Sequence, residues 1–393
     1  MTEGLFAPQP LEPSVRVCVL QAVLPAYRTP VFNALGRRDG IDLTVWAGSA
    51  AYGAKTDDPE RFESFSFRDA PVRHVGPLLW QPAQLESLRA GFDVVVFSWS
   101  TRYVQLGPSL ALARRAGVRS VVWGHGESTA DSPLRRRVRD GVSALADAVL
   151  VYNHRVAAEM RRRSSNPTKV FVALNAIDQT GIQAAREWWA ARPQELDQFR
   201  SEKDVAGRRL FVSLSRLRPD KKTGLLLRVF ARLVSEGRDV RLVVIGDGTE
   251  RARLEADARR LGIADRVRFL GTLYDERQIA AWCLSAVACV VPASIGLSLL
   301  HAFGYGLPVL TTDEDQTPEI EALEHGVNGL LVRPGDPEAL LDAMRDLLDD
   351  DPRQQALSRG ASATVTQGEF RLDGMVDGMV EAIQFAARAR RTS

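Results

Sequence analysis

The sequence contains few of the residues that build disulfides, metal sites or membrane spans. It has three cysteines and five histidines among 393 residues, and the cysteine spacing fits neither a disulfide framework nor a metal motif. Cys18 and Cys289 lie in apolar runs, so we interpret them as small buried apolar groups. No uninterrupted apolar run reaches the roughly 18 residues that span a bilayer. Since the first residues do not resemble a signal peptide either, we expect a cytoplasmic protein.

Charge is almost balanced over the whole chain but is unevenly placed. The formal net charge is +2, whereas residues 102–163 contain 12 arginines and five acidic residues. This excess is typical either of a solvated arginine-rich surface or of a patch that meets anionic lipid or a phosphate-bearing acceptor. Each basic residue near an anionic membrane contributes on the order of 1 kcal/mol. The second interpretation therefore predicts a weak peripheral contact at the inner face of the membrane, and no nucleic-acid partner is expected.

Length and apolar patterning predict the fold class. A chain of 393 residues is too long for one hydrophobic core, which indicates two domains. Short β-branched runs alternate with segments of helical period, as in open parallel sheets with helices on both faces. Strands are predicted at residues 15–23, 42–48, 92–99, 120–126, 148–153 and 169–175, and again at 209–217, 240–248, 266–273, 286–293, 307–312 and 328–334.

The two series of strands define the predicted domains. Residues 182–208 form a charged helical stretch between the series, so we place the first domain at residues 1–185 and the second at 186–370. The predicted fold class is α/β, with two Rossmann-like, doubly wound domains that face a cleft. Ligands bind at the carboxyl ends of the strands in such sheets.

A candidate anion site follows the first strand of the second domain. Residues 211–230 read as strand, loop and helix, and the loop places Arg216 and Lys221 five residues apart. A helix N-terminus adds free N–H groups and a partial positive charge. Arginine can fork onto phosphate oxygens, while lysine acts as a point charge. The alternative is a solvated charged turn.

A second candidate is the segment PASIGLSLLHAFGYGLP (292–308), which contains no Asp, Glu, Lys or Arg. Gly296 lets the backbone approach a ligand closely because it has no Cβ. The N–H groups of Gly296, Leu297 and Ser298 would then open a helix. The segment thus predicts diphosphate binding by backbone dipoles, which leaves the full charges to Arg216 and Lys221.

The order of motifs in the second domain resembles that of a known family, the group 1 (family 4) retaining glycosyltransferases of the GT-B fold. The resemblance is carried by SRLRPDKKTGLLL, VVIGDGTERARLE, VRFLGTL, VVPASIGLSLLHAFGYGLPVLTT, TPEI and HGVNGLLVRPGD, and by ALNAID (173–178) at the end of the first domain. It implies a nucleotide-sugar donor in the second domain. It also implies an acceptor in the first domain, with a final helix (371–393) that packs back onto that domain.

The resemblance also implies roles for single residues. Arg216 and Lys221 match the pair that binds the donor diphosphate, and these cations with the helix dipole take the electrostatic role of a metal, so no metal or other cofactor is expected. His125, between Gly124 and Gly126, resembles the histidine near the donor sugar. The alternative is a histidine packed at a strand end, but the two glycines would clear space around a site.

The chain departs from the family at two positions. Relatives have two glutamates separated by seven residues, where this chain has Ala293 and His301. His301 would meet ribose or phosphate, or is a satisfied core histidine. For Asp313-Glu314-Asp315 we consider a solvated loop, a contact to the donor sugar and a metal site. The full set of donor-binding candidates is Leu273, Ala293, Ser294, Ile295, Gly296, Leu297, Ser298 and His301.

The first domain lacks the glycine pair that follows the first strand in many relatives. Tyr27 and Arg28 stand there instead, in a loop before a helix. Trp99 and Arg102 follow another predicted strand. These four residues are the acceptor-side candidates.

The function that these features predict is retaining, metal-independent transfer of a sugar from a nucleoside diphosphate sugar to a hydroxyl of a sugar, a lipid-linked sugar or a small molecule. The setting implied by the resemblance is bacterial polysaccharide or glycoconjugate biosynthesis. Catalytic candidates are His125, Arg216 and Lys221, and the leaving phosphate can accept the proton. Two alternatives stay open: a catalytically silent nucleotide-sugar-binding subunit, and a sugar-nucleotide epimerase, which would need several carboxylates for proton transfer.

Overall fold

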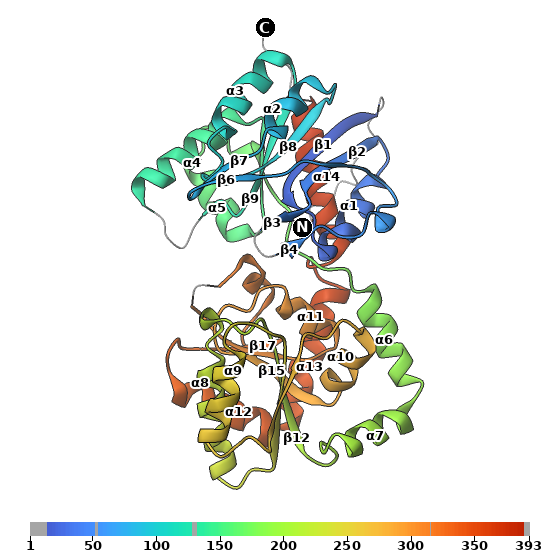
Figure 1. Ribbon diagram of the computed structural model, residues 1–393, viewed down its shortest axis with the longest axis vertical. Helices are drawn as coiled ribbons and strands as arrows, with labels where there is room; N and C mark the ends of the chain where they lie inside the picture. The colour runs from blue at the N-terminus through green and yellow to red at the C-terminus, as the bar shows by residue number, and fades with distance from the viewer. Residues whose placement is uncertain (1–13, 52–53, 128–131, 315, 389–393) are drawn as a thin grey trace, which may run out of the picture. The chain divides into compact units, whose positions relative to one another are not determined.

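A computed structural model describes residues 14–51, 54–127, 132–314 and 316–388. The chain divides into two compact units, of which unit 1 contains residues up to 178 and from 372 onward, and unit 2 contains residues 179–371. Each unit is built around a parallel sheet with helices on its faces (Figure 1). The predicted α/β class with two doubly wound sheets is therefore confirmed, whereas the predicted cleft stays a prediction.

The sheet of unit 1 contains seven parallel strands in the described part of the chain. In sheet order they are β11 (Val170–Val172), β10 (Ala148–Val151), β9 (Arg119–Gly124), β8 (Val94–Ser98), β1 (Val15–Val23), β2 (Ile41–Gly48) and β5 (Ser66–Asp69). The polar edge strand β5 has no apolar run and escaped prediction. So did two short hairpins, formed by β3 (Ala50–Ala51) with β4 (Ala54–Lys55) and by β6 (Arg73–Val75) with β7 (Leu78–Trp80).

Helices cover both faces of this sheet. The α-helices of unit 1 are α1 (Thr29–Gly36), α2 (Ala83–Glu86), α3 (Leu106–Ala116), α4 (Pro133–Leu145), α5 (His154–Arg163) and α14 (Leu372–Arg388). Short 3-10 turns occur at η1 (Ala26–Arg28), η2 (Pro59–Arg61), η3 (Ser87–Arg89) and η4 (Pro167–Lys169).

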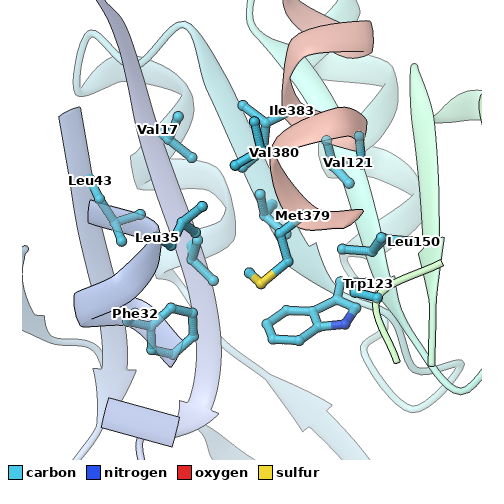
Figure 2. Close-up of a cluster of buried hydrophobic side chains, with 14 of the residues drawn as sticks. Val17, Phe32, Leu35, Leu43, Val121, Trp123, Leu150, Met379, Val380 and Ile383 are labelled. Carbon is cyan, nitrogen blue, oxygen red and sulfur yellow. The ribbon is translucent and has the colours of Figure 1, made fainter. Parts of the chain in front are cut away.

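The last helix, α14, belongs to the core of unit 1 although more than 190 residues separate it from the preceding element of that unit. It contacts α1, β9, β10 and β11. Its side chains Met379, Val380 and Ile383 enter one buried cluster with Trp123 and Leu150 (Figure 2). Gly378 allows this close packing, since a Cβ there would lie 1.9 Å from the carbonyl oxygen of Val172.

The sheet of unit 2 contains six parallel strands within the described residues. In sheet order they are β14 (Val267–Gly271), β13 (Val240–Ile245), β12 (Arg209–Leu214), β15 (Ala286–Val291), β16 (Val309–Thr312) and β17 (Gly329–Val332). The central strands read as nearly continuous apolar runs, such as AVACVV in β15, as expected for parallel strands buried on both faces.

The helical stretch predicted at 182–208 consists of two helices, and the break between them lies just before Pro193. The helices of unit 2 are α6 (Thr180–Ala190), α7 (Pro193–Glu202), α8 (Thr223–Ser235), α9 (Arg251–Arg260), α10 (Glu276–Cys283), α11 (Ser298–Gly304), α12 (Pro337–Asp349) and α13 (Asp351–Thr366), with turns η5 (Pro219–Lys221) and η6 (Pro318–Ala322). All three cysteines are buried free thiols, as expected for Cys18 and Cys289. Among the described residues, no helix is both long enough and apolar enough to traverse a bilayer.

The packing of α14 can be tested by adding one methyl group. We expect Gly378→Ala to lower the free energy of unfolding by about 1–3 kcal/mol, because the new Cβ overlaps the Val172 carbonyl. The control is Gly141→Ala in α4, where a Cβ would meet no atom within 4 Å. That change should stabilise by up to about 1 kcal/mol through helix propensity. Chemical denaturation measures both, and equal effects would contradict the packing.

Candidate functional site

The sheet topology of unit 2 places two loops at one point. The chain runs from β12 outward through β13 and β14, and then from β15 outward through β16 and β17 in the other direction. β12 and β15 are neighbours, so the loops that follow them diverge and leave a crevice at their carboxyl ends. Arg216 and Lys221 lie in the first loop, and residues 293–298 lie in the second.

The two cations differ in their surroundings. Arg216 is exposed and has no ion pair in the part of the chain that the structure describes. Lys221 is largely buried, and its Nζ donates a hydrogen bond to the carbonyl oxygen of Ser294, which ties the two loops together. Burial lowers the pKa of Lys221; Arg216 and Arg218 lower it further, while Asp220 opposes them. The loop is thus electropositive, which favours an anionic ligand.

The uncharged loop presents backbone donors to the same point. Gly296 has φ +69°, in the left-handed region that suits glycine, and open space surrounds its Cα. The N–H groups of Gly296, Leu297 and Ser298 donate to no acceptor among the described residues, and α11 begins at Ser298 without a side-chain cap. These free donors are suited to oxyanion binding.

Gln316 fixes the shape of this loop, a role that the sequence did not predict. Its Nε2 donates to the carbonyl oxygens of Ala293 and Thr312, and its Oε1 accepts from the N–H of Ile295. Ala293 and Ile295 are buried. Their side chains therefore support the loop from beneath, and Ala293 offers no polar group to a sugar.

His301 is paired with a carboxylate from another helix. Its Nε2 lies 2.6 Å from Oε1 of Glu276, at the first position of α10, and the hydroxyl of Tyr305 donates to the same oxygen. Burial pushes the pKa of Glu276 upward, but the hydrogen bonds from His301 and Tyr305 outweigh it and leave the pKa below its ordinary value. A carboxylate therefore lies beside position 301.

The acidic segment after β16 is held by a second lysine, Lys222. Glu314 forms an ion pair with Lys222, which has a left-handed backbone with φ 51°. Asp313 is exposed, and Asp315 lies outside the described residues. No group of three metal-ligating side chains occurs in the described ranges. Leu273 is half-buried after the edge strand β14, next to an almost fully exposed Tyr274.

In unit 1, His125 is exposed directly after β9, and its ring lies 5.0 Å from that of Tyr152. The flanking glycines are required by packing rather than by a ligand. A Cβ at Gly124 would lie 2.6 Å from the carbonyl oxygen of Trp99, and Gly126 has φ +69°. Close packing at Gly124 and the backbone conformation at Gly126 therefore explain why both positions are glycine, without a need to clear space for a site.

The acceptor-side candidates do not share one environment. Arg28 is buried among aromatic rings, whereas Tyr27 beside it is half exposed. Trp99 is buried against the backbone of Gly124. Arg102 is exposed, and its Nε donates to the carbonyl oxygen of Pro77 in the β6–β7 hairpin. The structure brings Tyr27 and Arg28 together and gives Arg102 a supporting role in that hairpin.

Comparison with known proteins agrees with this architecture. Residues 194–364 match the family described as glycosyl transferases group 1. N-acetyl-α-D-glucosaminyl L-malate synthase of Bacillus anthracis is 25% identical over 247 residues, which are 63% of this chain and 61% of that protein. D-inositol 3-phosphate glycosyltransferase of Thermobispora bispora is 34% identical over 168 residues, 40% of this chain and 39% of that protein. The chain thus spans less than two thirds of the length of these relatives.

Among solved structures, HepE of Anabaena in complex with UDP has a TM-score of 0.73 and 20% identity, and the match covers 94% of this chain and 99% of that one. The two doubly wound units and this likeness show the GT-B fold. The match to the group 1 glycosyl transferase family, at residues 194–364, lies within unit 2. Membership of family 4 stays a prediction.

The pairing of Glu276 predicts a dependence of stability on pH. The pKa of Glu276 in the folded state lies below its ordinary value of 4.5, so its contribution is present above that pH and is lost as the pH falls through the folded pKa. We expect Glu276→Gln to destabilise at neutral pH, and the gap from the parent protein to shrink as the pH falls below 4.5 and through the folded pKa. Denaturant titrations measure it. The exposed Glu195→Gln control should show no such trend, and a constant gap for Glu276→Gln would refute the pairing.

Proposed function

We propose that the protein transfers a sugar, with retention, from a nucleoside diphosphate sugar to an acceptor hydroxyl. The observation that carries this proposal is the meeting of Arg216, the largely buried Lys221 and the N–H groups of residues 296–298 where the loops after β12 and β15 diverge. Among the described residues, Arg216 has no ion pair and these N–H groups donate to no acceptor. A diphosphate offers several oxyanions to such a set of donors. The UDP complex of HepE supports a donor of this kind in a protein of the same fold.

The same donors would assist the chemical step. Negative charge accumulates on the leaving diphosphate in the transition state, and preorganised donors stabilise it there more than in the ground state. Arg216 and Lys221 supply full charge, so the proposed reaction needs no metal. We assign no general base, because the leaving phosphate can take the proton of the acceptor hydroxyl. His125 is proposed to contact the donor sugar.

A catalytically silent nucleotide-sugar-binding subunit is the second candidate. The observation that favours it is the burial of Ala293, whose carbonyl is engaged by Gln316 and whose methyl group cannot replace a carboxylate at the donor sugar. Binding of a sugar nucleotide without turnover, whatever acceptor is offered, would support this candidate.

A weak peripheral contact with an anionic membrane is also part of the proposal. Leu134 and Val138 lie one turn apart on α4 and are 72% and 48% exposed. Residues 135–137 of the same helix are arginines, and they are exposed as well. An exposed apolar stripe among arginines is typical of helices that lie in a membrane interface. This surface lies in unit 1, the unit proposed to bind the acceptor.

The anion site is tested by removing its charges. We expect Arg216→Ala combined with Lys221→Ala to abolish nucleotide release from sugar nucleotides and the melting shift that nucleoside diphosphates cause. The fold should survive, since Arg216 is exposed and Lys221 lies at a loop. Arg218→Ala is the matched control, because this exposed arginine of the same loop pairs with Asp220. Full activity in the double variant would end the proposal.

The membrane contact is tested by placing charge on the exposed stripe. Leu134→Glu with Val138→Glu should reduce co-sedimentation with phosphatidylglycerol vesicles several-fold at low salt, since it removes apolar area and adds repulsion. Val327→Glu, at a 45% exposed valine of unit 2, is the control. If both variants bind vesicles as the parent protein does, α4 is not the contact.

A further inference from the structure

Arg28 is a buried charge without a counter-charge. Its side chain belongs to a residue that is only 7% exposed, and in the described part of the chain it forms no ion pair. Its one hydrogen-bond contact joins Nη1 to the sulfur of Met375, 3.5 Å away on α14. A thioether is a weak acceptor. The guanidinium carries five N–H donors and stays charged at any physiological pH. Burial of an uncompensated charge is unfavourable for folding.

Three aromatic rings surround the guanidinium. The carbon Cζ of Arg28 lies 5.4 Å from the ring centre of Tyr27, 5.3 Å from that of Trp123 and 5.4 Å from that of Tyr152. Each ring face attracts the cation electrostatically. They hold the planar group in one orientation, but they neutralise no charge. Figure 2 shows Trp123 packed beside Phe32 and Met379, so the hydrophobic core fixes the position of the Trp123 ring.

The position of this cluster in the sheet is that of a ligand site. In unit 1 the chain runs from β1 outward through β2 and β5, and from β8 outward through β9 to β11. β1 and β8 are therefore the strands between which the direction changes, and ligands of doubly wound sheets bind outside that point. Arg28 follows β1, while Trp123 and Tyr152 lie at the carboxyl ends of β9 and β10.

The other polar groups nearby are donors as well. Nε1 of Trp123 is buried without a hydrogen-bond acceptor. Helix α1 begins directly after Arg28 and has no side-chain cap at its N-terminus. The hydroxyl of Thr29 already donates a hydrogen bond to the carboxylate of Asp57, which also forms an ion pair with Arg61. Within the described residues, the cluster thus holds donors in excess, and the guanidinium donates to no acceptor stronger than the thioether of Met375.

We propose that Arg28 binds an oxyanion of the acceptor, a carboxylate or a phosphate group next to the hydroxyl that receives the sugar. The inference rests on the proposed transferase function and names the class of acceptor. Arginine binds either anion through two parallel hydrogen bonds, and the surrounding rings exclude water from them. Tyr27, half exposed, is the outer ring that must turn aside to admit the anion. The names of two relatives, with L-malate and inositol 3-phosphate, fit an acceptor of this chemistry.

The first experiment measures anion binding without turnover. In the Arg216→Ala/Lys221→Ala background, which disables the donor site, inorganic phosphate should still raise the melting temperature. Adding Arg28→Met should abolish that rise, while the melting temperature without phosphate should hold or increase, because a buried unpaired charge has been removed. Arg38→Met is the matched control, since Arg38 also contacts α14 but is paired with Asp377. A phosphate effect that survives Arg28→Met overturns the proposal.

The second experiment measures acceptor choice in the otherwise intact protein. Matched pairs with and without the anion are offered: inositol phosphate against inositol, L-malate against its diamide, and phosphatidylinositol vesicles against neutral vesicles. We expect the anionic acceptor of one pair to exceed its neutral partner at least tenfold in kcat/KM. The pair that shows this preference tells whether the oxyanion belongs to a free acceptor or to a lipid headgroup. Arg28→Met should remove the preference, and Arg28→Lys should restore part of it.

The outcomes separate this inference from the proposed function. If no sugar nucleotide binds or releases its nucleotide, the transferase function fails, and phosphate binding at Arg28 is still decided by the first experiment. If transfer occurs equally to neutral and anionic acceptors, or if Arg28→Met leaves the preference unchanged, the transferase stands and the role of Arg28 is wrong.

Discussion

The hydrogen bond from Lys221 to the carbonyl oxygen of Ser294 is the interaction on which the proposed donor site depends. It joins the loops that follow β12 and β15, which the topology would otherwise lead apart. It also holds a lysine in a half-buried place close to Arg216 and Arg218, whose charges lower its pKa together with burial. Three like charges are kept close together by the fold, so a bound anion relieves a repulsion that is already present.

Both units place a cation at the same topological point. Arg28 follows the first strand of its sheet, and Arg216 follows the first strand of the other. The two arginines nevertheless differ in a way that suits different ligands. Arg216 is open to solvent beside free backbone donors, as a flexible diphosphate requires. Arg28 is fixed among three rings, as recognition of one small oxyanion requires.

The sequence predicted what is local and left out what depends on distant contacts. The strands were found because parallel strands buried on both faces read as apolar runs, and Arg216, Lys221 and Gly296 were found because strand–loop–helix motifs carry them. Gln316 escaped, since a glutamine in a polar loop has no signal, and its role arises from atoms about 20 residues away. No sequence signal pointed to Glu276, because its partners His301 and Tyr305 lie in and directly after another helix. The burial of Arg28 depends on Met375, 347 positions along the chain. The first unit ends at Asp178 rather than at residue 185, and α6 starts unit 2.

The two departures from the family pattern have unequal consequences. At position 301 a carboxylate from α10 lies close by, since Glu276 is 2.6 Å from the imidazole of His301, and hydrogen bonds hold its pKa low against the effect of burial. At position 293 the alanine is buried, and its carbonyl accepts hydrogen bonds from Thr311 and Gln316. Gln316 holds this loop by three hydrogen bonds, so its backbone has one shape before any ligand binds. In that shape, the N–H groups of Gly296, Leu297 and Ser298 donate to no acceptor among the described residues, and such donors suit an oxyanion.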